Sequence, residues 1–298
     1  MTHEAVRVTG VKAIPQSSRR CTAAAGRRVQ NVCGHDEVKR VPDLQGASTS
    51  KAEIGIIGSL WLELAPLVNQ CDQLRKTQGS SFTIHGGWLH GTRVAFVEAG
   101  IGKNRVQRAT QALIEGHSPE WVISIGLAGA LSPELAVEDI FLAKEIISTS
   151  GETLPVSDLF GSNTFFSNLS DDNHNIHRGQ LLCAEKVVCT RKEKQQLHAH
   201  YGASVVEMES LFVGQVCRDY GTSFGSVRVI SDDLETDLPP EIRGMLGSSK
   251  IFRVGAALGA VWNRPSSAQD LWNLREIANR ASESLARFVC SHLIERSP

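Results

Sequence analysis

The chain has 298 residues, 41% of them hydrophobic, so it can bury a full core and is not disordered as a whole. Lys and Arg number 31 against 32 Asp and Glu, a near-neutral balance that gives no global sign of a nucleic-acid or acidic-membrane partner. No apolar run approaches the roughly 18 to 20 residues of a membrane-spanning helix. We therefore expect no membrane span, no nucleic acid, and a small-molecule partner.

The seven cysteines are odd in number, scattered along the chain and never spaced C-x-x-C. This spacing argues against a zinc knuckle or a disulfide framework and favours a reducing, cytoplasmic setting. His174 and His177 are three residues apart but lie in a loop-like stretch, where solvated histidines are the ordinary interpretation. We expect no metal and no cofactor.

Residues 1–51 are rich in Arg, Ser, Ala and Gly and lack a sustained hydrophobic period. They predict a disordered extension, with the arginine pairs leaving a transit-like or twin-arginine address as an alternative. Residues 52–298 are predicted to form one domain.

From Ile54 onward, short β-branched runs alternate with helical stretches. The runs predict strands at Ile54–Gly58, Arg93–Val97, Trp121–Gly126, Asp139–Ala143, Gly179–Val188, Ser204–Met208 and Phe224–Ser231. Helical periods predict helices at Lys103–Glu115, Arg191–His200 and Ser210–Tyr220. Gly116 and Gly221 are expected C-caps.

A final helix is predicted after a cap at Ser266 and Ser267. Its apolar stripe comprises Leu271, Leu274, Ala278, Ala281, Leu285 and Phe288. Residues 148–178 are polar and rich in turn residues, which predicts a long excursion that is either functional or a solvated crossing. The pattern as a whole predicts a single-domain α/β fold with a central mixed sheet flanked by helices.

Four acidic residues fall where predicted strands end: Glu63, Glu207, Glu209 and Asp232. Open α/β sheets bind ligands at the carboxyl ends of their strands. Each acid also has an ordinary structural interpretation, as a first-turn helix residue favoured by the dipole or as a cap or turn residue. Their recurrence at one edge of the sheet is what predicts a site.

Several stretches resemble, in order and at suitable separations, the motifs of the nucleoside phosphorylase/nucleosidase superfamily. These stretches are IGIIGSLWLELAPL, EAGIGKNRVQRA, WVISIGLAGAL, EDIFLAKEI, GQLLCAEKVVCTRKEK, VVEMES and VRVISDD. Within the superfamily, residues 54–233 look most like the 5′-methylthioadenosine/S-adenosylhomocysteine nucleosidases. The following LETDLPPEIRGML looks closer to hopanoid-associated nucleoside phosphorylases.

The resemblance implies hydrolysis of the N-glycosidic bond of an adenine-type nucleoside, by a homodimer acting in methionine salvage. It implies that Asp232 holds or delivers a proton at purine N7. Glu63 would orient and deprotonate the attacking water with help from Arg228. Glu209 would accept hydrogen bonds from the ribose hydroxyls, and Met208 would pack on the sugar.

The resemblance also assigns Glu207, Ser231, Ala128 and Val187 to the substrate site. Glu207 has a buried structural role as its alternative. Val187 stands where the family has an aromatic residue that stacks on adenine, which weakens the expected grip on the base. Leu127 likewise replaces the family's serine in SIGLAG.

Water or phosphate could be the nucleophile. Superfamily phosphorylases carry arginines in the first strand-to-helix loop and before the Gly-rich stretch, but GSLWLELAPLVNQ contains none, and Ser124 and Ile125 stand at the second place. Backbone N–H groups around 100–102 could still bind an anion, so phosphorolysis remains the alternative. A nucleoside-binding protein without turnover is a second alternative, disfavoured by the retained acid and base.

Overall fold

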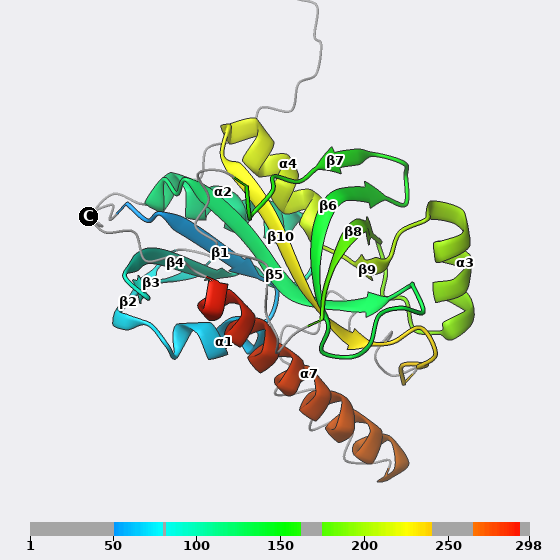
Figure 1. Ribbon diagram of the computed structural model, residues 1–298. Coiled ribbons are helices and arrows are strands. Elements are labelled where there is room, and N and C mark those ends of the chain that lie inside the picture. Colours follow the sequence, from blue (N-terminus) through cyan, green and yellow to red (C-terminus); the bar gives the residue numbers. More distant parts are fainter. Residues whose placement is uncertain (1–50, 80–81, 162–174, 240–264, 293–298) are drawn as a thin grey trace, which may run out of the picture. The chain divides into compact units, whose positions relative to one another are not determined.

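The computed structural model describes residues 51–79, 82–161, 175–239 and 265–292 (Figure 1). They all belong to one of the two units into which the chain divides, residues 41–298. The predicted extension at 1–51 lies outside the described residues except for its last one, as does the turn-rich stretch 162–174.

The described strands form one mixed sheet. They are β1 (Ile54–Gly58), β2 (Asp72–Gln78), β3 (Thr83–Leu89), β4 (Thr92–Glu98), β5 (Trp121–Ala130), β6 (Ile140–Ser148), β7 (Thr153–Pro155), β8 (Ile176–Cys183), β9 (Val205–Glu207) and β10 (Ser223–Asp232). The helices are α1 (Trp61–Val68), α2 (Lys103–His117), α3 (Arg191–Tyr201), α4 (Ser210–Tyr220) and α7 (Pro265–His292).

Strand β5 is the axis of the sheet. It pairs in parallel with β1 on one side and with β10 on the other, and its last two residues pair antiparallel with β9. Because β10 also pairs with β6, β6 with β8, and β8 with β9, these strands close a ring that includes β5. The carboxyl ends of β1, β5 and β10 therefore open at the same edge.

Two helical layers cover the faces of the sheet (Figure 1). Helices α2 and α4 pack their apolar stripes, including Val106 and Val213, on one face. Helices α1 and α7 pack on the other, where Leu64, Leu285 and Phe288 contact Ile56 of β1 and its neighbours in a second core cluster. This is the predicted sheet flanked by helices, and the alternation of apolar residues at helical spacing accounts for both layers.

Several boundaries differ from the sequence predictions. Helix α2 runs past Gly116, and Ser118 takes the left-handed C-cap position at φ 43°. The strand predicted over Gly179–Val188 is observed at Ile176–Cys183, and its ladder with β9 closes where the Ala184 N–H bonds the carbonyl of Glu207, the last residue of β9. The final helix begins at Pro265, so Ser266 and Ser267 lie inside it rather than capping it.

Strands β2, β3 and β7 were not predicted. Strand β2 reads DQLRKTQ and is almost wholly exposed, so no apolar alternation marks it. In the described part of the 148–178 excursion, β7 pairs with β6. His177 is the second residue of β8, and its Nε2 lies 3.2 Å from an Asp139 carboxylate oxygen. Over the residues the structure describes, no helix is both long and apolar enough to span a membrane, and no cluster of metal-ligating side chains occurs.

Candidate active site

Glu63 is held by backbone N–H groups from two elements. It lies in the first turn of α1, directly after β1, and only 5% of its surface is exposed. Its Oε2 accepts from Ser59 N and Leu60 N at 2.9 Å each, and Oε1 accepts from Leu127 N of β5 at 3.1 Å. Burial raises the pKa of Glu63, while these N–H groups and the charge of Arg228 act in the opposite direction. The carboxylate is therefore fixed in place and more basic than an exposed one.

Two glycines of β5 leave room for the two predicted catalytic carboxylates. A Cβ on Gly126 would lie 2.7 Å from Oε1 of Glu63, and a Cβ on Gly129 would lie 2.9 Å from Oδ2 of Asp232. Both distances are too short for a Cβ unless the carboxylate shifts, so glycine at each position lets the carboxylate stay where it is. Glu63 and Asp232 therefore both lie against the end of β5, next to glycines that are three positions apart in SIGLAGAL.

Glu207 and Arg228 form a buried ion pair at 3.0 Å. The guanidinium also donates to Ser124 Oγ at 2.7 Å and to Ser210 Oγ at 2.6 Å. Glu207 accepts in addition from the backbone N–H groups of Glu209 and Ser210. Glu207 is thus tied to the protein itself, and these contacts favour the buried structural role that the sequence left as its alternative.

Glu209 is partly buried at the start of α4 and faces other charges. Desolvation, followed by repulsion from Glu207 and Glu63, raises its pKa to about 8, although Arg228 and the N–H of Gly102 act against this. Because the charges of Glu63, Glu207 and Arg228 all act on the pKa of Glu209, these three groups and Glu209 form one cluster. A carboxyl group that titrates near neutrality is suited to exchange hydrogen bonds with hydroxyl groups.

This raised pKa predicts a pH-dependent stability. Because the folded protein holds the Glu209 proton more tightly than the unfolded chain, the free energy of unfolding falls as pH rises from about 4.5 to about 8. Glu209→Gln removes that loss, so at pH 8.5 the variant should melt roughly 5 °C above the wild type, with the gap closing toward pH 5.

The measurement is the melting temperature across this pH range. Glu134→Gln, at an exposed glutamate, is the matched control and should follow the wild type. A Glu209→Gln profile parallel to the wild type would contradict the assignment.

Asp232 ends β10 after a bulge at Ser231 and is 5% exposed. Its Oδ1 accepts from Ser231 Oγ at 2.6 Å, and this hydroxyl lies 3.3 Å from the carbonyl oxygen of Ala128 in β5. Its Oδ2 lies 2.6 Å from the ammonium group of Lys194 in α3. Sequence analysis did not single out Lys194, since nothing in a polar helical stretch marks one lysine as buried.

The predicted site residues therefore fall into two groups at the end of β5. Glu63, Glu207, Glu209 and Arg228 form one, and Asp232, Ser231 and Ala128 form the other. Met208 lies between the two glutamates, partly buried, and Val187 is partly buried in the loop after β8. The N–H of Ala184 in that loop bonds the carbonyl of Glu207, which ties the loop to the end of β9.

The glycine-rich stretch 100–102 uses its backbone N–H groups within the protein. Gly100 N donates to the carbonyl of Ser59 at 3.0 Å, and the N–H of Gly102 bonds the Glu209 carboxylate. These are two of the donors that the sequence left open for an anion. The carboxyl group of Glu209 already takes one of them, so that donor is not open to a phosphate.

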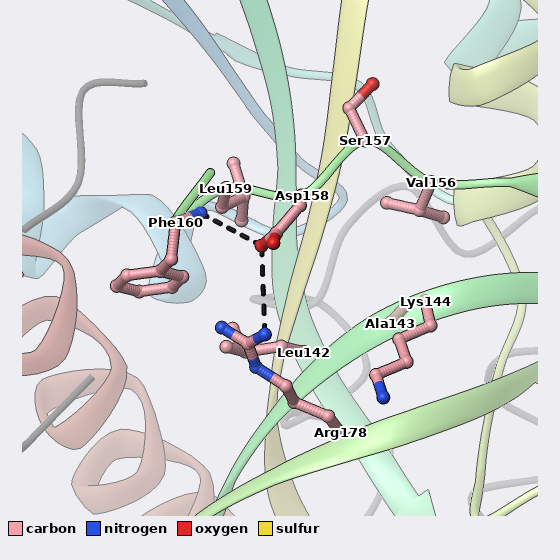
Figure 2. Close-up of a pocket in the computed structure, with 9 residues that line it drawn as sticks. All are labelled: Leu142, Ala143, Lys144, Val156, Ser157, Asp158, Leu159, Phe160 and Arg178. Atoms are coloured by element: carbon pink, nitrogen blue, oxygen red, sulfur yellow. Dashed lines mark hydrogen bonds and ion pairs between the residues drawn. The ribbon is translucent and has the colours of Figure 1, made fainter. Parts of the chain in front are cut away.

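Figure 2 shows a separate cavity between β6, β8 and the segment 156–160, with a volume of about 220 Å³. Asp158 lies 3.8 Å from the guanidinium of Arg178, which also stands over the ring of Phe160. None of its lining residues belongs to the two carboxylate groups. Ligand pockets usually measure about 300 to 1,000 Å³, so this cavity is small for a nucleoside.

Comparison with known proteins identifies the family of the chain. The family model described as Phosphorylase superfamily matches residues 53–243. A 5′-methylthioadenosine/S-adenosylhomocysteine nucleosidase of Baumannia cicadellinicola is 29% identical over 195 residues, covering 60% of this chain and 85% of the relative.

Two solved structures share the fold. The methylthioadenosine/S-adenosylhomocysteine nucleosidase of Colwellia psychrerythraea, in complex with adenine, superposes with a TM-score of 0.59 at 19% identity, covering 84% of this chain and 98% of that one. Futalosine hydrolase of Helicobacter pylori superposes with a TM-score of 0.57 at 18% identity, covering 82% and 97%. The predicted nucleoside phosphorylase-like fold is therefore confirmed.

Proposed function

Because the chain belongs to the phosphorylase superfamily, we propose that it hydrolyses the N-glycosidic bond of an adenine-type purine nucleoside and releases the free base. The observation that carries this proposal is a pair of carboxylates that are held separately at β5: Glu63 lies beside Gly126, and Asp232 lies beside Gly129. Cleavage of this bond needs an acid at the base and a group that activates the nucleophile at the sugar. Two carboxylates in different surroundings can divide these tasks.

Asp232 acts on the base. When the C1′–N9 bond breaks, its electron pair passes to the purine, and a proton at N7 makes the purine a better leaving group. Ser231 Oγ and Lys194 Nζ hold the two oxygens of Asp232. A group fixed in this way loses little freedom when it meets the substrate.

Glu63 acts on the water. Its raised pKa makes it a better proton acceptor than an exposed glutamate, and the three N–H groups aim it from the turn before α1 and from β5. Arg228 acts through its charge, since its guanidinium is already bound to Ser124, Glu207 and Ser210. It keeps the pKa of Glu63 from rising further, so that more of Glu63 is ionised at neutral pH.

Glu209 binds the ribose hydroxyls, with Met208 beside it on the sugar. Negative charge in this cluster favours the positive charge that develops on the sugar as the bond breaks. Those glutamates of the cluster that are ionised therefore help more in the transition state than in the bound substrate.

The same cluster favours water over phosphate as the nucleophile. A phosphate dianion needs fixed cationic donors, whereas the described cluster offers three carboxylates and an arginine that is engaged internally. The engaged N–H groups of Gly100 and Gly102 add to this argument. Phosphorolysis is the alternative.

The names of the relatives support 5′-methylthioadenosine or S-adenosylhomocysteine as the substrate. The likeness of LETDLPPEIRGML to hopanoid-associated phosphorylases supports a larger apolar 5′ substituent instead; residues 240–264, which include the end of that stretch, lie outside the described ones. An aliphatic contact from Val187 to the base is compatible with either of these substrates. We further propose a cytoplasmic homodimer acting in methionine salvage, on the resemblance and on the described cysteines, which are all free thiols.

Incubation with methylthioadenosine, S-adenosylhomocysteine, adenosine and inosine tests the proposal. We expect free adenine from at least one adenine nucleoside, at a rate that does not change when phosphate is added. Tight binding of a nucleoside without base release would instead identify a nucleoside-binding protein.

A further inference from the structure

Lys194 is fully buried, with 0% of its surface exposed. A lysine is rarely buried in this way unless its charge and donors are satisfied. Its ammonium group reaches three acceptors: Oδ2 of Asp232 at 2.6 Å, the carbonyl of Thr236 at 3.0 Å, and the carbonyl of Asp233. All of these belong to the end of β10 and the turn that follows.

The first turn of α3 is built to aim this lysine. Thr190 caps the helix by accepting from the N–H of Glu193 at 3.2 Å, and the Glu193 carboxylate accepts from Thr190 N at 3.1 Å. Lys194 follows as the fourth residue of the helix. Its position is therefore set by the cap rather than by a flexible loop.

The same turn of α3 holds the chain beyond Asp232 at further points. Arg191 pairs with Glu235 at 2.5 Å, and its N–H donates to Asp237 Oδ1 at 2.6 Å. Asp233 closes the turn itself by accepting from Thr236 N at 2.8 Å. The orientation of Asp232 is thus fixed by α3 as well as by its own strand.

We propose that Lys194 is a positioning residue that shares its proton with Asp232, so that the pair, rather than the carboxyl group alone, supplies the proton to the purine. This inference rests on the proposed function. Asp232 gives a proton to N7 as the C1′–N9 bond breaks, and it takes one from Lys194 Nζ across the 2.6 Å contact. Water adds to C1′ and gives its proton to Glu63, which releases that proton to solvent as the products leave. Lys194 regains a proton from solvent through Asp232 once the base has left.

Among the described residues, the charged groups near the pair are Arg191 and Glu193 from α3, with Asp233, Glu235 and Asp237 from the segment after β10; the Asp233 carboxylate is bound within its turn. Arg191 is bound to Glu235 and Asp237, and Glu193 is bound to the helix cap. Strand β5 contributes Gly129, which carries no charge. Removing Lys194 therefore takes away the positive charge beside Asp232, and none of these groups is placed to replace it.

Lys194→Met tests this role because it keeps the length of the side chain and removes the charge. We expect kcat at pH 7 to fall by about 10²- to 10³-fold, within the range of general acid catalysis, with a smaller change in KM. The alkaline limb of the kcat–pH profile should move to lower pH, because the variant lacks the ammonium proton that the pair can supply. Lys192→Met, at an exposed lysine of the same helix, should change neither quantity.

A uniform loss of kcat with an unmoved alkaline limb would overturn the proposal, because a merely structural lysine gives that result. A wild type that releases no base from any nucleoside would refute the proposed function instead. The pairing is then tested by melting temperatures: Lys194→Met and Asp232→Asn should each lower Tm by about 4 °C or more, and the double variant by less than the sum. If the Tm losses of the two single variants simply add in the double variant, the proposed pairing of Lys194 with Asp232 is contradicted.

Discussion

Asp232→Asn should lower turnover by about 10²- to 10⁴-fold while leaving nucleoside affinity much less changed. Asparagine keeps the size of the side chain and can still hydrogen-bond a purine, but it has no proton to give to N7. Its contact with Ser231 Oγ can persist, so the end of β10 should keep its shape. The measurement is kcat against the dissociation constant of a nucleoside or of adenine, for the variant and the wild type.

Asp233→Asn provides the matched control. Asp233 Oδ1 accepts from Glu235 N, Thr236 N and Thr236 Oγ1, which identifies it as the residue that builds the turn. The amide oxygen of asparagine can take over these bonds, so turnover should stay near the wild type. A crippled Asp233→Asn beside an active Asp232→Asn would show that the acid has been assigned to the wrong aspartate.

Arg228→Met should have the largest effect on stability. The guanidinium is 2% exposed and compensates the buried carboxylate of Glu207. Breaking a buried pair from one side costs about 3 to 5 kcal/mol, which for a domain of this size lowers Tm by roughly 10 °C. The same change removes the positive charge that holds down the pKa of Glu63 and Glu209, so both pKa values should rise further.

Arg218→Met is the comparison for this prediction. Arg218 lies in α4 and pairs with Asp219 at 3.5 Å, with both side chains more than half exposed. An exposed pair contributes about 1 kcal/mol or less, so Tm should hardly move. Equal losses from the two variants would mean that the buried network does not stabilise the protein as its contacts suggest.

The sequence predicted the strands that position the site, because β1, β5 and β10 are buried apolar runs bounded by turn residues. It also predicted that acids at strand ends would lie at one edge; in the structure Glu63, which follows β1, lies in a cluster with Glu207 and Glu209, which lie at and just after the end of β9. Exposed β2 carries no such pattern and was missed. The end of β8 was missed as well, since the predicted strand took in Glu185 and Lys186 to reach Val187 and Val188, whereas the strand ends at Cys183.

Two features of the site depend on contacts that sequence order hides. Lys194 resembles any polar helical residue until β10, some forty positions later, brings Asp232 to it. The glycine spacing in SIGLAGAL could have been interpreted as space for carboxylates, because Gly126 and Gly129 each face one. That interpretation needed the pairing of β5 with both β1 and β10, which a single sequence does not reveal.

The most direct test of the account is the identity of the nucleophile. The purified protein is incubated with 5′-methylthioadenosine in ¹⁸O-labelled water, with and without phosphate, and the sugar product is analysed by mass spectrometry. Hydrolysis at the carboxylate cluster predicts free adenine and a free sugar that carries one ¹⁸O, in equal amounts under both conditions. An unlabelled sugar 1-phosphate that forms only when phosphate is present would contradict it.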